Sequence, residues 1–233
     1  MSNVLPILCV PGLGCSARLY AEQIPQLWTV GPVTIARHDQ HESMAEIARA
    51  ILESAPERFA LIGLSMGGHI SFEILRQAPE RITKLALLDT SSRPDTPERA
   101  VKRRALMDGT RTRSMSEISD ELFPLYVHPM RHNDSQLRDI CRLMAEETGA
   151  AGFIRQQTAL MNRPDSRPTC RTIHCPTLVL AGDSDELTPP AIAAEIAGGI
   201  DGARLVIVPD CGHLSTLERP REVTEALIGL LRS

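Results

Sequence analysis

A serine stands at the centre of a glycine-framed pentapeptide, Gly63-Leu64-Ser65-Met66-Gly67. The preceding run, Phe59–Ile62, is apolar and of strand length, and a helical pattern over Met66–Gln77 begins directly after the serine. Glycines on either side let a strand and a helix approach closely enough to hold a serine on a tight, strained turn. Its hydroxyl would lie at a helix N-terminus, which favours negative charge. The pattern predicts that Ser65 is a nucleophile, and the alternative is a glycine-rich turn with an incidental serine.

A nucleophilic serine needs a general base, and His213 is the best placed of the seven histidines. It lies in a loop directly after an apolar run of strand length. An acid that precedes it in the chain would accept a hydrogen bond from its Nδ1 and stabilise the imidazolium. The stretch Gly182–Pro189 offers three carboxylates, and the residue pattern does not choose between Asp183 and Asp185. The alternative for His213 is a surface-loop histidine.

Short apolar runs alternate with helical patterns along the chain. The strand candidates are Ile7–Val10, Val33–Ala36, Phe59–Ile62, Leu85–Asp89, Thr177–Ala181 and Arg204–Val208. Unbroken runs of this kind are typical of parallel strands that are covered on both faces. The helical patterns around them are Ser43–Ser54, Met66–Gln77 and Arg221–Leu231. This order predicts an α/β fold with a mostly parallel sheet and helices on both faces.

Between about residues 91 and 172 the pattern is helical throughout. The candidate helices are Glu98–Met107, Ser116–Leu122, Ser135–Glu147 and Gly152–Asn162. A helical insertion between two strands predicts a lid over the carboxyl edge of the sheet, where open α/β sheets bind ligands. We therefore expect a core formed by residues 1–90 and 173–233 and a helical lid, or cap, formed by residues 91–172. The alternative is a helical excursion that does not contact the site.

The predicted lid is rich in apolar side chains, which indicates an apolar acyl site, although we expect most of them to pack between lid helices. They are Met107, Met115, Met130, Met144, Met161, Leu122, Phe123 and Phe153. The lid also contains a group of arginines that we expect to be solvated, with binding of a carboxylate-bearing substrate as the alternative. They are Arg103, Arg104, Arg111 and Arg113.

The bulk composition narrows the classes of function. A length of 233 residues with 42% hydrophobic residues predicts one domain with room for a small accessory subdomain. The net charge of −4 gives no indication of nucleic-acid or membrane-surface binding. The six cysteines form no C-x-x-C pair, so we expect free thiols, no metal and no cofactor. Because Met1–Ile7 resembles neither a signal peptide nor an anchor, we expect a cytoplasmic protein with a small-molecule substrate.

Four blocks resemble the α/β-hydrolase superfamily, especially its lid-bearing branch of small esterases, enol-lactonases and C–C bond hydrolases. They are Val10-Pro11-Gly12-Leu13-Gly14, Gly63–Gly68, Gly182–Pro189 and Cys211-Gly212-His213, and they span the whole chain in the family's order. The resemblance implies an α/β-hydrolase fold of about six strands, with the lid between the fourth and fifth strands. It also implies that the acid is Asp185, four residues before the proline of a G-x-x-D-x-x-x-P stretch, which leaves Asp183 as a loop or capping carboxylate.

Acyl transfer places negative charge on a carbonyl oxygen, and two backbone N–H groups should stabilise that charge. One is the N–H of Met66, and the resemblance places the other on Leu13, in the loop after the first strand. The chain departs from the family at Pro11, where a histidine is usual, and at Arg37–His41, where relatives often have a glycine-rich loop. Because the N–H belongs to a later residue, we expect this oxyanion hole to form. The alternative is a plain Pro-Gly turn.

Together these residues predict a serine hydrolase that acts on a small, largely apolar carboxylic ester through an acyl-enzyme, with Ser65, His213 and Asp185 as the triad. Thioester hydrolysis, enol-lactone opening and C–C bond cleavage use the same groups and stay as alternatives. No residue distinguishes a haloperoxidase-like activity, and epoxide or haloalkane hydrolysis is disfavoured because such relatives have Asp in place of Ser65. The alternative from another class is a receptor that keeps the triad and closes its lid on a small molecule.

Overall fold

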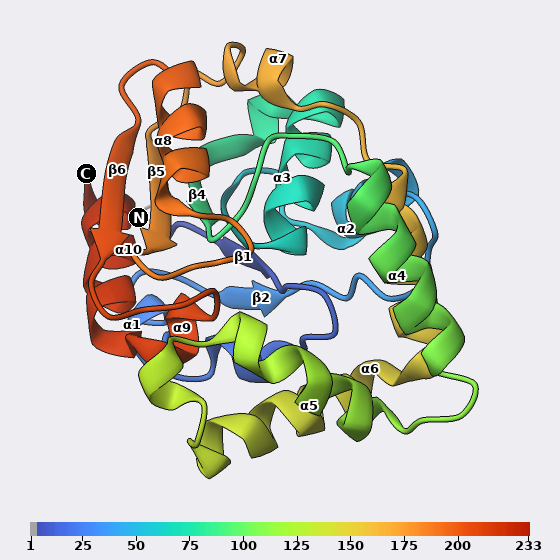
Figure 1. Cartoon of the computed structure of the whole chain (residues 1–233). Helices are drawn as coiled ribbons and strands as arrows, with labels where there is room; N and C mark the ends of the chain where they lie inside the picture. The colour runs from blue at the N-terminus through green and yellow to red at the C-terminus, as the bar shows by residue number, and fades with distance from the viewer. Residues whose placement is uncertain (1–3) are drawn as a thin grey trace.

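Six parallel strands form one sheet at the centre of the computed structural model, which describes residues 4–233 (Figure 1). The strands are β1 (Ile7–Val10), β2 (Val33–Ile35), β3 (Phe59–Leu64), β4 (Ile82–Leu88), β5 (Thr177–Gly182) and β6 (Arg204–Val208). Their order is β2-β1-β3-β4-β5-β6, and every neighbouring pair is parallel. The carboxyl ends of all six strands therefore lie at the same edge. The predicted α/β fold with a mostly parallel sheet is confirmed.

The strand bounds differ most from expectation at β4. The sequence predicted a strand over Leu85–Asp89, whereas the structure begins it at Ile82 and ends it at Leu88. The polar residues Thr83 and Lys84 interrupt the apolar run, although Lys84 aligns with β3 and its Nζ donates to the carbonyl oxygen of Leu230 (2.9 Å). Asp89 leaves the strand conformation with φ 44°.

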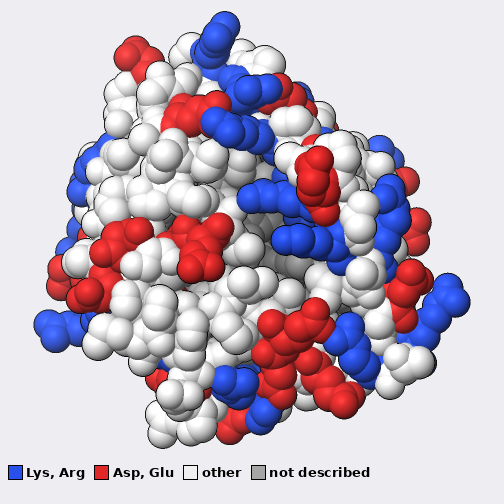
Figure 2. Space-filling view, viewed as in Figure 1, with Lys and Arg blue, Asp and Glu red and all other residues white. Residues whose placement is uncertain are grey.

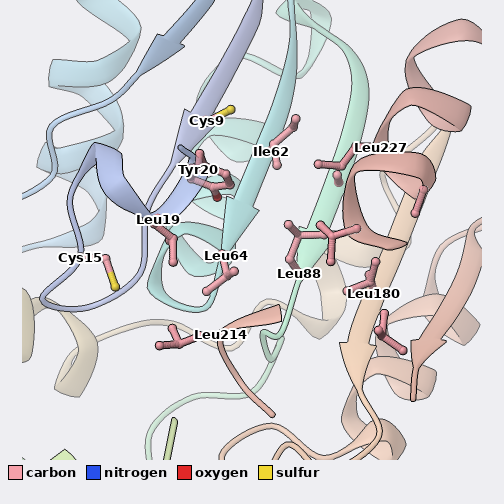
Figure 3. Close-up of a cluster of buried hydrophobic side chains, with 14 of the residues drawn as sticks. Cys9, Cys15, Leu19, Tyr20, Ile62, Leu64, Leu88, Leu180, Leu214 and Leu227 are labelled. Carbon is pink, nitrogen blue, oxygen red and sulfur yellow. The ribbon is translucent and has the colours of Figure 1, made fainter. Parts of the chain in front are cut away.

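Alternating strand side chains face two separate helical layers, as expected for a sheet that is buried on both faces. One layer contains α1 (Ile24–Leu27), α9 (Ser215–Glu218) and α10 (Pro220–Arg232), and the other contains α2 (Met44–Ser54), α3 (Met66–Gln77) and α8 (Pro190–Gly199) (Figure 1). On the first face, Leu227 of α10 lies beside Ile62 and Leu88 of adjacent strands (Figure 3). On the opposite face, Leu61 packs in the cluster that contains Ile70 of α3. Helix α8 was not predicted, because its alanine-rich sequence has little polar–apolar contrast.

Between β4 and β5 the described chain forms helices and loops without a strand, and Figure 1 shows these helices in green, yellow and, for α7, orange. They are α4 (Pro97–Gly109), α5 (Met115–Tyr126), α6 (Ser135–Met161) and α7 (Arg167–Cys170). The helix α6 spans the two helices predicted on either side of Gly149, whose φ of 68° and ψ of 163° interrupt the helical backbone. Ser114 caps α5 through a reciprocal capping box with Glu117. Three short 3-10 helices complete the chain at Ala17–Tyr20, Pro79–Arg81 and Pro129–Arg131.

Among the helices of residues 4–233, none combines the length and the apolar character that a membrane span requires. The expectation about the N-terminal segment Met1–Ile7 rests in part on residues 1–3, which lie outside the described residues.

The turn between β3 and α3 depends on two glycines that allow close backbone contact. A Cβ atom on Gly67 would lie 1.9 Å from a backbone oxygen of β1, and one on Gly63 would lie 2.4 Å from the Gly67 carbonyl oxygen. Between them, Ser65 has φ 54° and ψ −112°, which is a strained conformation for a residue with a side chain. The Ser65 N–H donates to Leu88 (2.9 Å), and Thr90 Oγ1 donates to the Ser65 carbonyl oxygen (2.7 Å). These contacts fix the serine at the carboxyl edge of the sheet.

We expect Gly67→Ala to lower the free energy of unfolding by about 2–3 kcal/mol, because the nearest atoms belong to backbone that cannot move aside. The matched control is Gly198→Ala on α8, where an added Cβ atom meets nothing within 4 Å. That substitution should leave the stability unchanged or raise it by up to about 1 kcal/mol, since alanine favours the helix. Urea denaturation measures both, and equal stability of the two variants would contradict the predicted clash.

Candidate active site

Three predicted side chains meet at the carboxyl edge of the sheet. Ser65 follows β3, Asp185 follows β5 and His213 follows β6. The Nε2 atom of His213 lies 2.8 Å from Ser65 Oγ, and its Nδ1 atom lies 2.8 Å from Asp185 Oδ2. His213 and Asp185 are both buried. The arrangement is that of a hydroxyl, a base and an acid that orients the base.

The local loop keeps Asp185 ionised. Its Oδ1 accepts hydrogen bonds from the N–H groups of Leu187 (2.8 Å) and Thr188 (2.9 Å), and its Oδ2 accepts one from Thr188 Oγ1 (2.7 Å). Burial acts to raise the pKa of Asp185, but the His213 charge and these hydrogen bonds outweigh it and lower the pKa to about 2. Burial alone would lower the pKa of His213, yet the charge and hydrogen bond of Asp185 raise it above its ordinary value.

The second candidate acid, Asp183, has a different position. It is exposed, and its carboxylate accepts hydrogen bonds from the N–H groups of Asp210 (3.0 Å) and Cys211 (3.1 Å). Asp183 therefore holds the start of the loop that carries His213. The structure brings Asp185, and not Asp183, to the imidazole.

A buried glutamate that the sequence did not indicate supports the same loop. Glu218 accepts hydrogen bonds from the N–H groups of Gly212 (3.0 Å) and His128 (2.7 Å), and burial raises its pKa. The His213 N–H donates to the carbonyl oxygen of Tyr126, at the end of α5 (2.9 Å). The loop is thus bonded to the helical insertion. No local pattern marks Glu218, because its partners lie 6 and 90 positions away.

The loop after β1 lies directly against the serine. A Cβ atom built on Gly12 would be 3.5 Å from Ser65 Cβ, and Leu13 lines the same cavity as the serine. The N–H groups of Leu13 and Met66 donate to no other group within residues 4–233. Both remain available to a ligand oxygen, which is the arrangement that an oxyanion hole needs.

Two buried polar side chains that the sequence did not single out hold this loop. The Gly14 N–H donates to Gln156 Oε1 of α6 (2.9 Å), and the Nε2–H of His38 donates to the carbonyl oxygen of Gly12 (2.9 Å). Burial lowers the pKa of His38, which favours the neutral ring. His38 belongs to the segment Arg37–His41 that departs from the glycine-rich pattern. Through the contact with Gly12, this segment supports the loop after β1.

A cavity of about 360 Å³ opens beside Ser65 and is lined by residues of both the core and the helical insertion. It is the hollow near the centre of Figure 2. Its apolar lining includes Leu13, Leu122, Leu125 and Tyr126. The helices α4, α5 and α6 all contribute side chains, so the insertion contacts the site.

The apolar residues expected in the lid lie in different environments: a small cavity, the main core and the surface. Met115, Met144 and Phe153 line a smaller apolar cavity of about 20 Å³ next to Leu13. Phe123 is buried in the main core, whereas Met130 is 81% exposed and contacts neither cavity.

The four predicted lid arginines also separate into two groups. Arg103 lines the large cavity. Arg104 and Arg111 are exposed, and Arg113 pairs with Glu121.

Within residues 4–233, no group of three or more His, Cys, Asp and Glu side chains is arranged to hold a metal ion. All six cysteines are free thiols.

A third carboxyl group, Asp89, is fully buried at the end of β4. Its Oδ1 accepts a hydrogen bond from the Gly182 N–H (3.0 Å), and Ser215 Oγ is hydrogen-bonded to its Oδ2. Burial and then the negative charge of Asp185 raise the pKa of Asp89 to about 8. Burial and the nearby Asp185 charge therefore favour the protonated form of Asp89, whereas Asp185 is held ionised.

We expect Asp89→Asn to change how stability depends on pH. Below pH 3.8, the ordinary pKa, both folded and unfolded wild-type chains are protonated at Asp89. As the pH rises from there to about 8, the unfolded chain loses the proton first, so the wild type loses stability that the variant keeps. The melting temperature of Asp89→Asn minus that of the wild type should therefore grow across this window.

Asp183→Asn is the control for this measurement. Hydrogen bonds from the backbone of Cys211 and Asp210 lower the pKa of Asp183 against the opposing effect of burial, so its contribution is present above the ordinary pKa and is lost as the pH falls. That variant should lose stability relative to the wild type as the pH rises. Parallel pH curves for Asp89→Asn and the wild type would show that Asp89 titrates normally.

Comparisons with known proteins agree with this architecture. A family model described as alpha/beta hydrolase fold matches residues 10–220. A thermophilic esterase from Thermogutta terrifontis, solved with malate bound, is 28% identical with a TM-score of 0.88, covering 98% of this chain and 89% of the esterase. The enol-lactonase from Burkholderia xenovorans is 25% identical with a TM-score of 0.87, covering 100% of this chain and 93% of the lactonase. A pimeloyl-acyl-carrier-protein methyl ester esterase from Nitrosomonas europaea is 24% identical over 78% of this chain and 74% of its own length.

Proposed function

The chain belongs to the α/β-hydrolase family, and we propose that it is a serine hydrolase that cleaves carboxylic esters through an acyl-enzyme. The observation that carries the proposal is the pair of 2.8 Å contacts that join Ser65 Oγ to His213 and His213 to Asp185. Two of the three relatives named above are esterases, which favours an ester over the other bonds that the same groups can attack.

In the acylation step, Ser65 Oγ attacks the ester carbonyl carbon while His213 Nε2 removes the hydroxyl proton. The ionised Asp185 stabilises the resulting imidazolium. The N–H groups of Leu13 and Met66 donate to the carbonyl oxygen as it becomes negatively charged. When the tetrahedral intermediate collapses, the alcohol leaves with the proton from His213, and the acyl group stays on Ser65.

In the second step, His213 removes a proton from water, which attacks the acyl-enzyme. The acid leaves, and Ser65 regains its proton. In this proposal, residues 91–172 act as a lid, because their side chains line the cavity in which both steps take place. In the same proposal, the predicted core of residues 1–90 and 173–233 supplies the reacting groups.

The first prediction is that Ser65→Ala lowers kcat/KM for a short-chain p-nitrophenyl ester by about 10⁴-fold or more, because no nucleophile remains. The measurement is the release of p-nitrophenol, and a circular dichroism melt shows that the variant is folded. Acyl thioesters and enol-lactones belong in the same panel, since the structure of an enol-lactonase is similar. Undiminished ester turnover by a folded Ser65→Ala would overturn the proposal. A chain that binds esters and does not turn them over would instead be a receptor.

The second prediction separates the two candidate acids. Asp185→Asn should lower kcat by about 10⁴-fold, since the imidazolium loses its counter-charge. Asp183→Asn is the matched control and should retain most of the activity, because Asp183 contacts loop backbone and not His213. Similar losses in both variants would contradict the assignment of Asp185.

The pH profile gives an independent readout of the same pair. His213 acts as a base only when neutral, and Asp185 raises its pKa. The kcat/KM of the wild type should therefore rise with pH through a midpoint above 6.5, the ordinary pKa of histidine. In Asp185→Asn this midpoint should move to lower pH.

A further inference from the structure

Four basic side chains line the cavity that contains Ser65. They are Arg99, Lys102, Arg103 and Arg163. The first three lie on α4, and Arg163 follows α6. Figure 2 shows Lys and Arg side chains gathered on one side of the central hollow. We call these four residues the basic wall.

The basic wall keeps a net positive charge after its acidic neighbours are considered. Asp95 is shared by two of its members, since it accepts hydrogen bonds from Arg103 Nε (2.9 Å) and Arg163 Nη1 (2.8 Å). Arg99 and Lys102 form no ion pair within the described part of the chain, and the Arg99 guanidinium donates only to the carbonyl oxygen of Leu187 (2.9 Å). Glu186 is the one exposed acidic side chain among the described lining residues. Asp95 and Glu186 therefore offset two of the four positive charges of the basic wall, and two positive charges remain.

A buried amide beside the basic wall has an unused donor. Gln157 is fully buried and lines the cavity. Its Oε1 accepts a hydrogen bond from Arg103 Nη1 (2.7 Å), whereas its Nε2 has no hydrogen-bond partner within residues 4–233. A buried amide donor without a partner is costly, so a ligand acceptor that reached Nε2 would relieve that cost.

His69 lies one helical turn after Ser65 on α3 and also lines the cavity. Burial and then the charges of Arg163 and Arg103 lower its pKa well below the ordinary value. The ring is therefore neutral. The positive charges of the basic wall therefore add to the effect of burial at a residue one helical turn after Ser65.

We propose that the basic wall and Gln157 bind a free carboxylate on the substrate, so that the preferred ester carries a carboxylate at the end of its acyl chain. This inference rests on the proposed function and names its substrate class. A carboxylate is acceptor-only and suits guanidinium and amide donors. The carbon chain between the two ends would pack on the apolar lining that includes Leu122 and Leu125.

The test compares monomethyl adipate with the methyl ester of adipamic acid, which has the same shape and a neutral amide in place of the carboxylate. We expect kcat/KM to be at least about tenfold higher for the acidic ester, because only the carboxylate brings a negative charge to the positively charged Arg and Lys donors. The advantage should fall as sodium chloride is added, since salt screens exposed charges. Equal kcat/KM for the two esters would overturn the inference.

Variants then locate the effect. Arg99→Gln and Lys102→Gln change exposed residues that line the cavity, so folding should survive, and each should lower the ratio of kcat/KM between the acidic and neutral esters several-fold. Arg104→Gln is the matched control, because Arg104 is an exposed arginine on the same helix outside the cavity lining. A wild-type ratio in both Arg99→Gln and Lys102→Gln would overturn the role of the basic wall.

Binding to Ser65→Ala separates this inference from the proposed function. If both esters are cleaved with equal efficiency, the proposed function stands and the carboxylate preference fails. If neither methyl ester is cleaved, calorimetry on Ser65→Ala decides the carboxylate preference, and the proposed function fails only if the p-nitrophenyl ester is not cleaved either. Tighter binding of monomethyl adipate than of its amide analogue would support the basic wall, and equal binding would overturn it.

Discussion

The close backbone contact between Gly67 and β1 is the constraint on which the rest of the site depends. It holds the turn after β3 so tightly that Ser65 has a positive φ and its side chain lies at the sheet edge. Val10, the last residue of β1, pairs with Gly63 in the parallel register, so β1 ends next to this turn. The loop with Leu13 therefore begins beside the serine. One packing contact positions the hydroxyl and the amide donors that would stabilise its reaction.

Three carboxyl groups near the ends of β4 and β5 differ in environment rather than in residue type. Asp185 is buried, but a loop threonine and His213 supply hydrogen bonds and charge that keep it ionised. Asp89 is buried a short distance along the same edge with fewer donors, and burial and then the negative charge of Asp185 raise its pKa, which favours its protonated form. Asp183 is exposed and serves as an anchor for the loop backbone. Burial and hydrogen bonding thus separate three identical side chains into an ionised acid, a neutral acid and a structural anchor.

The sequence predicted the features that depend on local residue patterns. Apolar runs with adjacent glycines located the strands and the turn at Ser65, since close packing requires those residue types at fixed spacing. The choice between Asp183 and Asp185 needed the resemblance to a family, because it depends on which carboxylate the loop turns toward His213. The supports of the loops, Glu218 and Gln156, gave no signal, since their partners are distant in the chain. Tertiary contacts of this kind leave no periodicity to detect.

Two consecutive residues of α6 connect the helical insertion to both halves of the site. Gln156 accepts a hydrogen bond from Gly14 in the loop after β1, while Gln157 accepts one from Arg103 in the basic wall. Neighbouring helical residues point about 100° apart, so this part of α6 lies between the loop and α4. A carboxylate bound to the proposed basic wall would therefore be connected, through Arg103 and Gln157, to the helix that also holds the loop with Gly14. Binding energy from the remote end of the substrate can in this way stabilise the transition state and raise kcat, rather than only lower KM.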